Sequence, residues 1–310
     1  MNPAFSVVIF TTIAGAAQGL VVTLALAALA GLALSAGFIS TALIVAEVML
    51  LIGLGASFTH LGRPERAWRA VLMWRTSWLS REVIVLPAFI GINALWWLGL
   101  RMDAQAPLTS LLPLAAIAVA GVLWYCTAMI YACLRFIQEW AQPLTLVNFT
   151  LIGLSSGLIL ASALAALANE TGLLRVSGPC ALLATLVAWV TRMLALRHNA
   201  TLRHKSTLQS ATGINAPNLV QKSMGMSAGS FNTREFFHGR TLALLKQVKL
   251  SFIVLCFALP ALLALWGLAG GGAPAWVLAV LVQAPGLIAE RWFFFAQAKH
   301  PQNLYYQVVS

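Results

Sequence analysis

The chain has 310 residues, of which 60% are hydrophobic and 9% are charged, and its mean hydropathy is +0.87. This composition excludes an ordinary soluble globular protein and is typical of a membrane protein. Its net charge is +11, from 19 Lys and Arg against eight Asp and Glu. In a membrane protein this excess favours roles in topology and in binding anionic lipid, and we expect no nucleic acid partner.

Apolar segments long enough to cross a hydrocarbon core about 30 Å thick recur along the sequence. We count eight, at residues 5–34, 38–59, 82–100, 111–134, 146–168, 177–196, 251–269 and 275–298. Each is predicted to be a helix, because a span exposed to lipid must satisfy its own backbone hydrogen bonds. The predicted fold class is therefore an all-α integral membrane protein with eight transmembrane helices.

Two basic connections, after the second and the sixth segment, occupy the same place in each half of the sequence. This spacing suggests a single membrane domain built from two four-helix bundles, residues 1–134 and 146–298. Gly15 with Gly19, and Gly153 with Gly157, form small-x-x-x-small patterns that allow close helix packing.

The distribution of basic residues predicts the orientation of the protein. Seventeen of the 19 Lys and Arg residues fall on the side of the two termini and two on the other side. The positive-inside rule therefore predicts that both termini and both basic connections lie in the cytoplasm. The first ten residues include no Lys or Arg, so we expect the first span to be retained rather than removed as a signal peptide.

Cysteine and histidine positions argue against metal sites in this protein. The four cysteines all lie in predicted spans without a C-x-x-C pair, which suggests neither a cluster site nor a disulfide framework. A bis-histidine haem would need imidazoles inside a bundle. His60 comes near the end of a predicted span, and the other four histidines lie in loops or at the ends of spans. We expect no haem and no metal ligands. No enzyme signature is present, so we expect no substrate chemistry from this chain alone.

The first basic connection, "SFTHLGRPERAWRAVLMWRTSWLSREV", carries His60 and Glu82 at its two ends. Both should lie at the same membrane depth, where an imidazole and a carboxylate can exchange protons with a quinone ring whose tail remains in lipid. A second interpretation stays open, in which His60 ends a helix and Glu82 pairs with Arg81 or Arg75.

The run of His60, Leu61 and Gly62, then "RPERAW", then Ser80, Arg81 and Glu82 at a helix start, resembles the DmsC family of dimethyl sulfoxide reductase membrane anchors. The resemblance covers nearly the whole sequence and the eight-helix layout. It implies a molybdopterin catalytic subunit and a four-cluster iron–sulfur subunit as partners, and electron exchange with ubiquinone or menaquinone. It also implies a quinone site in loop 60–82, with these residues: His60, Glu82, Arg81, Ser80 and Gly62.

The second basic connection, residues 197–249, departs from the best-known members of that family by its length. Flexible disorder is one interpretation. The other is docking of the iron–sulfur subunit, because aromatic and Arg residues are enriched in protein interfaces. The docking candidates are Phe231, Arg234, Phe236, Phe237 and His238, with Arg63, Arg66 and Arg69 of the first connection.

This connection also resembles that of membrane subunits of cytoplasmic sulfite dehydrogenases that use quinone, which belong to the same family. The resemblance implies sulfite oxidation with quinone as acceptor. Alternatives are the anchor of a sulfoxide or N-oxide reductase that oxidises menaquinol, and a passive anchor without a quinone site.

Three charged residues lie inside predicted spans. Glu47, in the middle of the second segment, is a core residue bonded to Gln18, a proton relay, or the ion site of a secondary transporter. Glu290 and Arg291 form a buried pair near the cytoplasmic edge in the simplest interpretation. We favour structural roles for all three.

Overall fold

A computed structural model describes residues 3–59, 61–102, 108–203, 205–220 and 242–301, and these residues form helices and no strands. The elements are α1 (Phe5–Leu29), α2 (Ala36–Phe58), η1 (Pro64–Met73), α3 (Trp78–Arg101), α4 (Leu108–Ala132), α5 (Pro143–Leu167), α6 (Thr171–Thr201), α7 (Leu208–Thr212), α9 (Leu242–Phe252), η2 (Ile253–Ala258), α10 (Leu259–Trp266), η3 (Gly267–Gly271) and α11 (Gly272–Ala296). The all-α prediction is confirmed for these residues.

The described residues include seven helical stretches that are long and apolar enough to cross a membrane. The first six match the first six predicted segments. The seventh, Leu242–Ala296, has 55 residues and joins the last two predicted segments. The protein is thus a multi-pass membrane protein.

A break divides this long stretch at Gly270, where φ is +104°, a value that favours glycine over residues with a side chain. The helices on either side of the break, α10 and α11, pack against each other. A Cβ atom on Gly267 would lie 2.6 Å from the ring of Trp276 in α11, so glycine permits this close approach.

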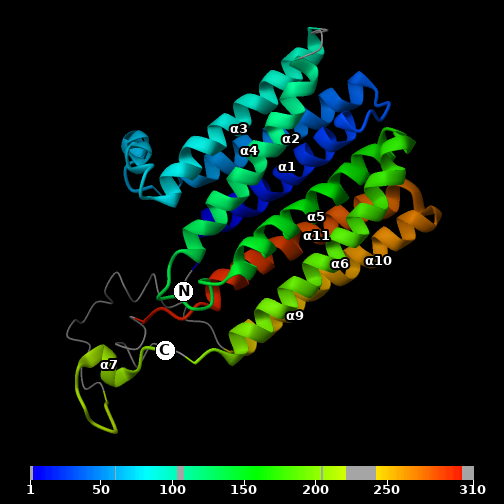
Figure 1. The fold of residues 1–310 in the computed structure, drawn as a ribbon. Helices are drawn as coiled ribbons and strands as arrows, with labels where there is room; N and C mark the ends of the chain where they lie inside the picture. Colours follow the sequence, from blue (N-terminus) through cyan, green and yellow to red (C-terminus); the bar gives the residue numbers. More distant parts are fainter. Residues whose placement is uncertain (1–2, 60, 103–107, 204, 221–241, 302–310) are drawn as a thin grey trace.

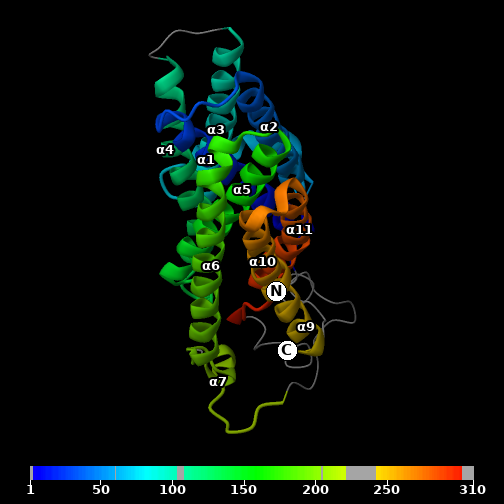
Figure 2. The same cartoon turned by 90° about the vertical axis from the view of Figure 1, so that its right-hand side faces the viewer.

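Helix α1 lies at the centre and packs against α2, α4, α5 and α11 (Figures 1 and 2). Its contact with α5 is made by the predicted small-residue faces, which pack on each other. A Cβ atom on Gly19 would lie 2.2 Å from the carbonyl oxygen of Gly153, and one on Gly157 would lie 2.1 Å from the carbonyl carbon of Gly19. Glycine therefore lets these two backbones touch.

The two ends of the described sequence lie at the same end of the structure. Figure 1 shows the start of α1, the end of α11, η1 and α7 toward the left, with η1 above and α7 below, while the connections 30–35, 168–170 and 270–272 lie at the opposite end. Residues that are far apart in sequence, in the two basic connections, therefore reach one face.

Candidate functional site

Helix α3 begins at Trp78, four residues before the start of the predicted segment 82–100, so Glu82 is the fifth residue of the helix. Ser77 caps it, accepting a hydrogen bond on its side-chain oxygen from the backbone N–H of Ser80 at 3.3 Å. Ser80 and Glu82 both lie in the interior, where they are 3% and 5% exposed.

The described partner of Glu82 is Thr127 of α4, whose hydroxyl donates a hydrogen bond to the carboxylate oxygen Oε1. This bond links two spans at the end of the structure that carries the basic connections. Thr127 was not among the residues predicted to form the site, because nothing in its local sequence pattern separates it from other hydroxyl residues of apolar helices.

Arg81 binds the preceding loop. Its Nε donates to the carbonyl of Trp74 at 3.0 Å and its Nη2 to that of Arg75 at 2.9 Å. Its guanidinium also lies 4.0 Å from the ring centroid of Trp78. Among the described ion pairs, Glu82 is paired with neither Arg81 nor Arg75, so the pairing expected in the second interpretation is wrong. The other part of that interpretation concerns His60, which lies outside the described residues.

Several predicted site residues remain untested by the geometry. His60 lies outside the described residues, as do the docking candidates Phe231, Arg234, Phe236, Phe237 and His238. Gly62, Arg63, Arg66 and Arg69 are described, and all four are exposed. In the described part of the protein, no group of three or more His, Cys, Asp or Glu residues could hold a metal ion.

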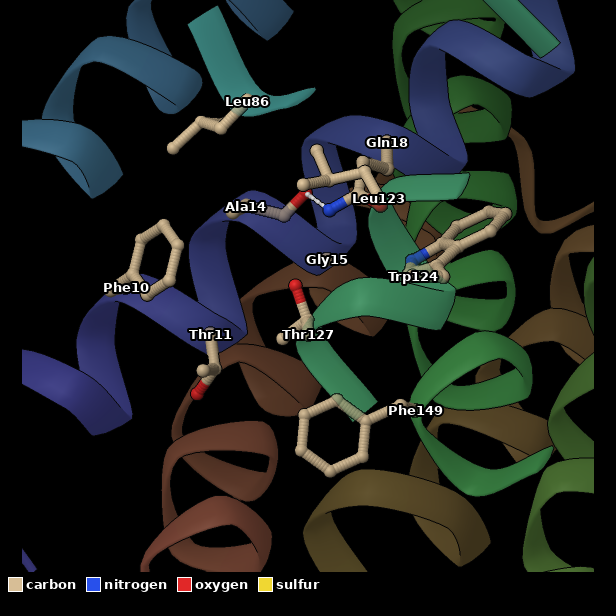
Figure 3. Close-up of a pocket in the computed structure, with 10 residues that line it drawn as sticks. All are labelled: Phe10, Thr11, Ala14, Gly15, Gln18, Leu86, Leu123, Trp124, Thr127 and Phe149. Carbon is tan, nitrogen blue, oxygen red and sulfur yellow. Dashed lines mark hydrogen bonds between the residues drawn. The ribbon is translucent and has the colours of Figure 1, made fainter. Parts of the chain in front are cut away.

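A narrow cavity of about 10 Å³ lies beside Thr127, with room for about one water molecule (Figure 3). Helices α1, α3, α4 and α5 all contribute to its lining. Two of the lining side chains carry buried polar atoms that lack a hydrogen-bond partner among the described residues, namely Oε1 of Gln18 and Nε1 of Trp124.

Glu47 is bound by Asn93 of α3, whose Nδ2 lies 2.6 Å from Oε2 of Glu47 and 3.2 Å from the carbonyl of Leu43. The predicted bond to Gln18 is wrong, since the amide of Gln18 donates to Ala14 in its own helix at 3.1 Å. Within the membrane, Asn93 can satisfy polar groups of α2 that no water would reach.

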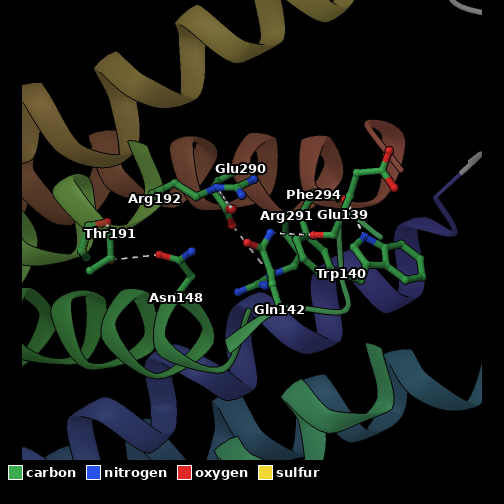
Figure 4. A network of polar contacts seen from close by, with 10 residues as sticks. Glu139, Trp140, Gln142, Asn148, Thr191, Arg192, Glu290, Arg291 and Phe294 are labelled. Atoms are coloured by element: carbon green, nitrogen blue, oxygen red, sulfur yellow. Dashed lines mark hydrogen bonds and ion pairs between the residues drawn. The ribbon is translucent and has the colours of Figure 1, made fainter. Parts of the chain in front are cut away.

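A second polar cluster lies among α5, α6 and α11 (Figure 4). Nε of Arg192 lies 2.7 Å from Oε1 of Glu290, and both side chains are 2% exposed. Arg291 lies 3.9 Å from Oε2 of Glu290 and its guanidinium is 3.7 Å from the ring centroid of Phe149. The predicted pairing of Glu290 with Arg291 therefore holds in part, and Arg192 is the closer partner.

The sequence did hold a signal for Arg192, which lies inside the predicted span 177–196, where a charged residue is unusual. Carboxamides surround the cluster. The hydroxyl of Thr191 donates to Asn148 at 2.9 Å, and the amide of Gln142 donates to Asn199 at 2.8 Å.

Comparison with known proteins decides the family. The model of the DMSO reductase anchor subunit family (DmsC) matches residues 1–295. The chain belongs to the DmsC family. It is 45% identical to the C subunit of the sulfite dehydrogenase of Allochromatium vinosum, over the full length of both proteins.

Two Escherichia coli members of the DmsC family match over shorter stretches. The C chain of anaerobic dimethyl sulfoxide reductase is 28% identical over 53% of the present sequence and 58% of its own. The YnfH chain of an anaerobic dimethyl sulfoxide reductase is 32% identical over 39% of the present sequence and 44% of its own. The expected DmsC resemblance is confirmed.

Proposed function

We propose that the protein is the membrane anchor and quinone-reactive subunit of a molybdopterin and iron–sulfur oxidoreductase that oxidises sulfite with quinone as acceptor. The observation that carries this proposal is the 45% identity to the C subunit of a sulfite dehydrogenase along the full length of both proteins. The soluble subunits would oxidise sulfite, and the membrane subunit would pass the electrons to the quinone pool. It would do no sulfite chemistry alone.

The proposed quinone site is formed by Glu82 with His60, Arg81, Ser80 and Gly62. Glu82 fits this role because it is a buried carboxylate in the second turn of α3, held by a hydroxyl from α4. When bound, a quinone takes up two electrons and two protons as it is reduced. The carboxyl group of Glu82 can donate a proton to a ring oxygen and regain one from water at the end of the helix.

The cavity beside Thr127 is too small for a quinone ring, so we assign it to water. A molecule between Gln18 and Trp124 would extend the polar contacts of Glu82 and Thr127 toward α1.

The proposed topology has eight crossings in two four-helix bundles, with both termini in the cytoplasm of a bacterium and the protein in its inner membrane. Its support is the break at Gly270 between the packed helices α10 and α11, and the common face reached by η1, α7 and the described ends. The soluble partners, a molybdopterin subunit and a four-cluster iron–sulfur subunit, would dock on that face. Exposed arginines of η1 and residues of loop 197–249 would contact them.

The test is purification of the protein from its native membranes with a tag at its C-terminus. We expect molybdopterin and iron–sulfur subunits to co-purify, and the complex to reduce a ubiquinone analogue when sulfite is added. A complex that instead oxidises menaquinol with dimethyl sulfoxide would favour the reductase alternative, which the matches to dimethyl sulfoxide reductase chains support. Purification of the protein without partners, with ion-driven transport in vesicles, would favour the transporter alternative.

A further inference from the structure

The segment from Arg63 to Arg75 has a period of three. Arginine recurs at Arg63, Arg66, Arg69 and Arg75, interrupted once by Leu72. The positions one residue earlier are Glu65, Trp68, Val71 and Trp74. The remaining positions are Pro64, Ala67, Ala70 and Met73.

Most of this segment, Pro64–Met73, forms the 3₁₀ helix η1. A 3₁₀ helix has three residues per turn, so each set of residues forms one row along the helix. Within η1, the arginine row is Arg66 and Arg69 followed by Leu72, the aromatic row is Trp68 and Val71 preceded by Glu65, and the alanine row is Ala67 and Ala70. Arg63 precedes the helix, and Trp74 and Arg75 follow it. Rows of this kind cannot arise in an α-helix, where residues three apart drift around the surface.

The three rows meet different surroundings. Ala67 and Ala70 are half-buried, and η1 packs against α3. The other residues of η1 are exposed, including Trp68 at 62% and Val71 at 37% in the aromatic row, and Leu72 at 64% in the row of the arginines. Large apolar side chains are thus presented outward by an element whose small row rests on a membrane-spanning helix.

The position of η1 indicates what covers these side chains. Both of its ends lead directly into spans, α2 before it and α3 after it. Figure 1 shows η1 beside the end of α3, displaced sideways from the bundle rather than extended beyond it. An element in this place lies at the level where the helix ends meet the membrane surface.

The chemistry of the rows fits that surface. Tryptophan is enriched where its ring can lie at the level of the lipid headgroups, and arginine contacts their phosphates from the same depth. Guanidinium groups lie next to the rings, Arg69 at 5.6 Å from the ring centroid of Trp68 and Arg75 at 5.4 Å from that of Trp74. Two hydrogen bonds from Arg81 to the carbonyls of Trp74 and Arg75 fasten the end of the segment to α3.

We propose that η1 is an interfacial helix whose aromatic row lies in the cytoplasmic lipid leaflet, while its arginine row faces the headgroups and the water. A 3₁₀ helix of ten residues is uncommonly long. Burial of the aromatic row in lipid supplies stabilisation that the contact with α3 alone does not. The arginine row stays free to meet a soluble subunit, so the inference does not depend on quinone chemistry.

The experiment uses the full-length membrane protein, reconstituted without its soluble partners, in vesicles of phosphatidylethanolamine and phosphatidylglycerol. Exposed Cys133 and Cys180 are first replaced by serine, and a nitroxide label is attached either to Val71→Cys in the aromatic row or to Arg66→Cys in the arginine row. Relaxation of the label by oxygen, which concentrates in lipid, is compared with relaxation by a water-soluble nickel complex. The two label sites lie less than two helical turns apart and therefore control for each other.

We expect the label at position 71 to be relaxed several-fold more by oxygen than by nickel, and the label at position 66 to show the opposite order. Strong relaxation by nickel at position 71 would place the aromatic row in water and overturn the proposal. Exclusion of both reagents from position 71 would overturn it as well, because protein rather than lipid would then cover the row. Circular dichroism and the thermal midpoint of the labelled proteins, compared with those of the unlabelled protein, show that the fold is intact.

Discussion

The carboxylate of Glu82 takes its orientation from another helix. Thr127 donates to it from α4, and Ser77 fixes the turn of α3 on which it lies. A group held in this way can present a proton to a bound ring in one defined direction, which is what general acid–base chemistry needs.

Replacing Glu82 or His60 should slow electron transfer to quinone but not electron transfer from sulfite to a soluble dye. In Glu82→Gln or His60→Ala, sulfite oxidation with a soluble dye should continue, while quinone-linked turnover falls by about 100-fold because a general acid–base contribution is lost. Both rates are measured on one purified complex. Glu65→Gln, an exposed carboxylate of η1, is the matched control. Unchanged quinone turnover in both variants would remove Glu82 and His60 from the site.

We expect the buried pair of Arg192 and Glu290 to stabilise the folded protein rather than to set its orientation in the membrane. In Glu290→Gln, two guanidiniums, of Arg192 and Arg291, would stay buried without a carboxylate between them. Removing one partner of a buried pair costs about 3–5 kcal/mol. We expect a large fall in the midpoint of thermal unfolding in detergent. The exposed Glu65→Gln, whose carboxylate is 4.0 Å from Arg66, should cost about 0–1 kcal/mol, and equal losses in the two variants would contradict this assignment.

At the scale of elements, polar bonds join α2 to α3 inside the membrane. Asn93 binds Glu47, and the indole of Trp97 donates to Ser40 at 2.9 Å. Such bonds contribute on average about 0.6 kcal/mol each in membrane proteins. This modest contribution favours a structural role for Glu47, and no transport function is needed to explain it.

Glu47 therefore distinguishes a helix contact from a proton relay. Glu47→Gln keeps an oxygen that can accept from Asn93, so we expect stability and quinone-linked turnover close to those of the unchanged protein. Glu47→Leu should lower stability slightly, by loss of the bond. If Glu47→Gln abolished quinone-linked turnover while dye-linked turnover continued, Glu47 would be a relay.

The spans were predictable from the sequence because length and hydropathy dictate them. The ends of the spans were harder to predict. Helix α3, for example, begins four residues before the predicted start, where Ser77 forms a local capping bond. Contacts such as Glu82 with Thr127, or Arg192 with Glu290, join residues 45 and 98 positions apart, and no local pattern specifies them. The period of three in η1 was visible in the sequence, but only the 3₁₀ geometry gives it a meaning.

At the scale of the whole molecule, the glycines of α1 and α5 join the two halves. Gly157→Ala would place a Cβ atom 2.1 Å from the backbone of Gly19, which cannot yield as a side chain would. Overpacking of this kind costs about 1–3 kcal/mol or more. We expect a clear fall in the thermal midpoint of the purified complex. Gly121→Ala in α4, where no heavy atom lies within 4 Å, is the control and should be neutral or slightly stabilising. An equal response to both changes would show that the α1–α5 contact is not tight.

The orientation proposed for the protein in its membrane rests on the count of basic residues, and the structure refines this count. Of the 17 basic residues assigned to the side of the termini, Arg192 and Arg291 are buried beside Glu290, which leaves 15 against two. The asymmetry that the positive-inside rule requires is therefore kept.

A fluorescent protein fused after Ser310 should be bright, and alkaline phosphatase at the same place inactive. A truncated protein ending at Asn169, after α5, should give the reverse, because its end is predicted to lie outside the cytoplasm. Active phosphatase after Ser310 would invert the whole topology, and with it the face on which the soluble subunits dock.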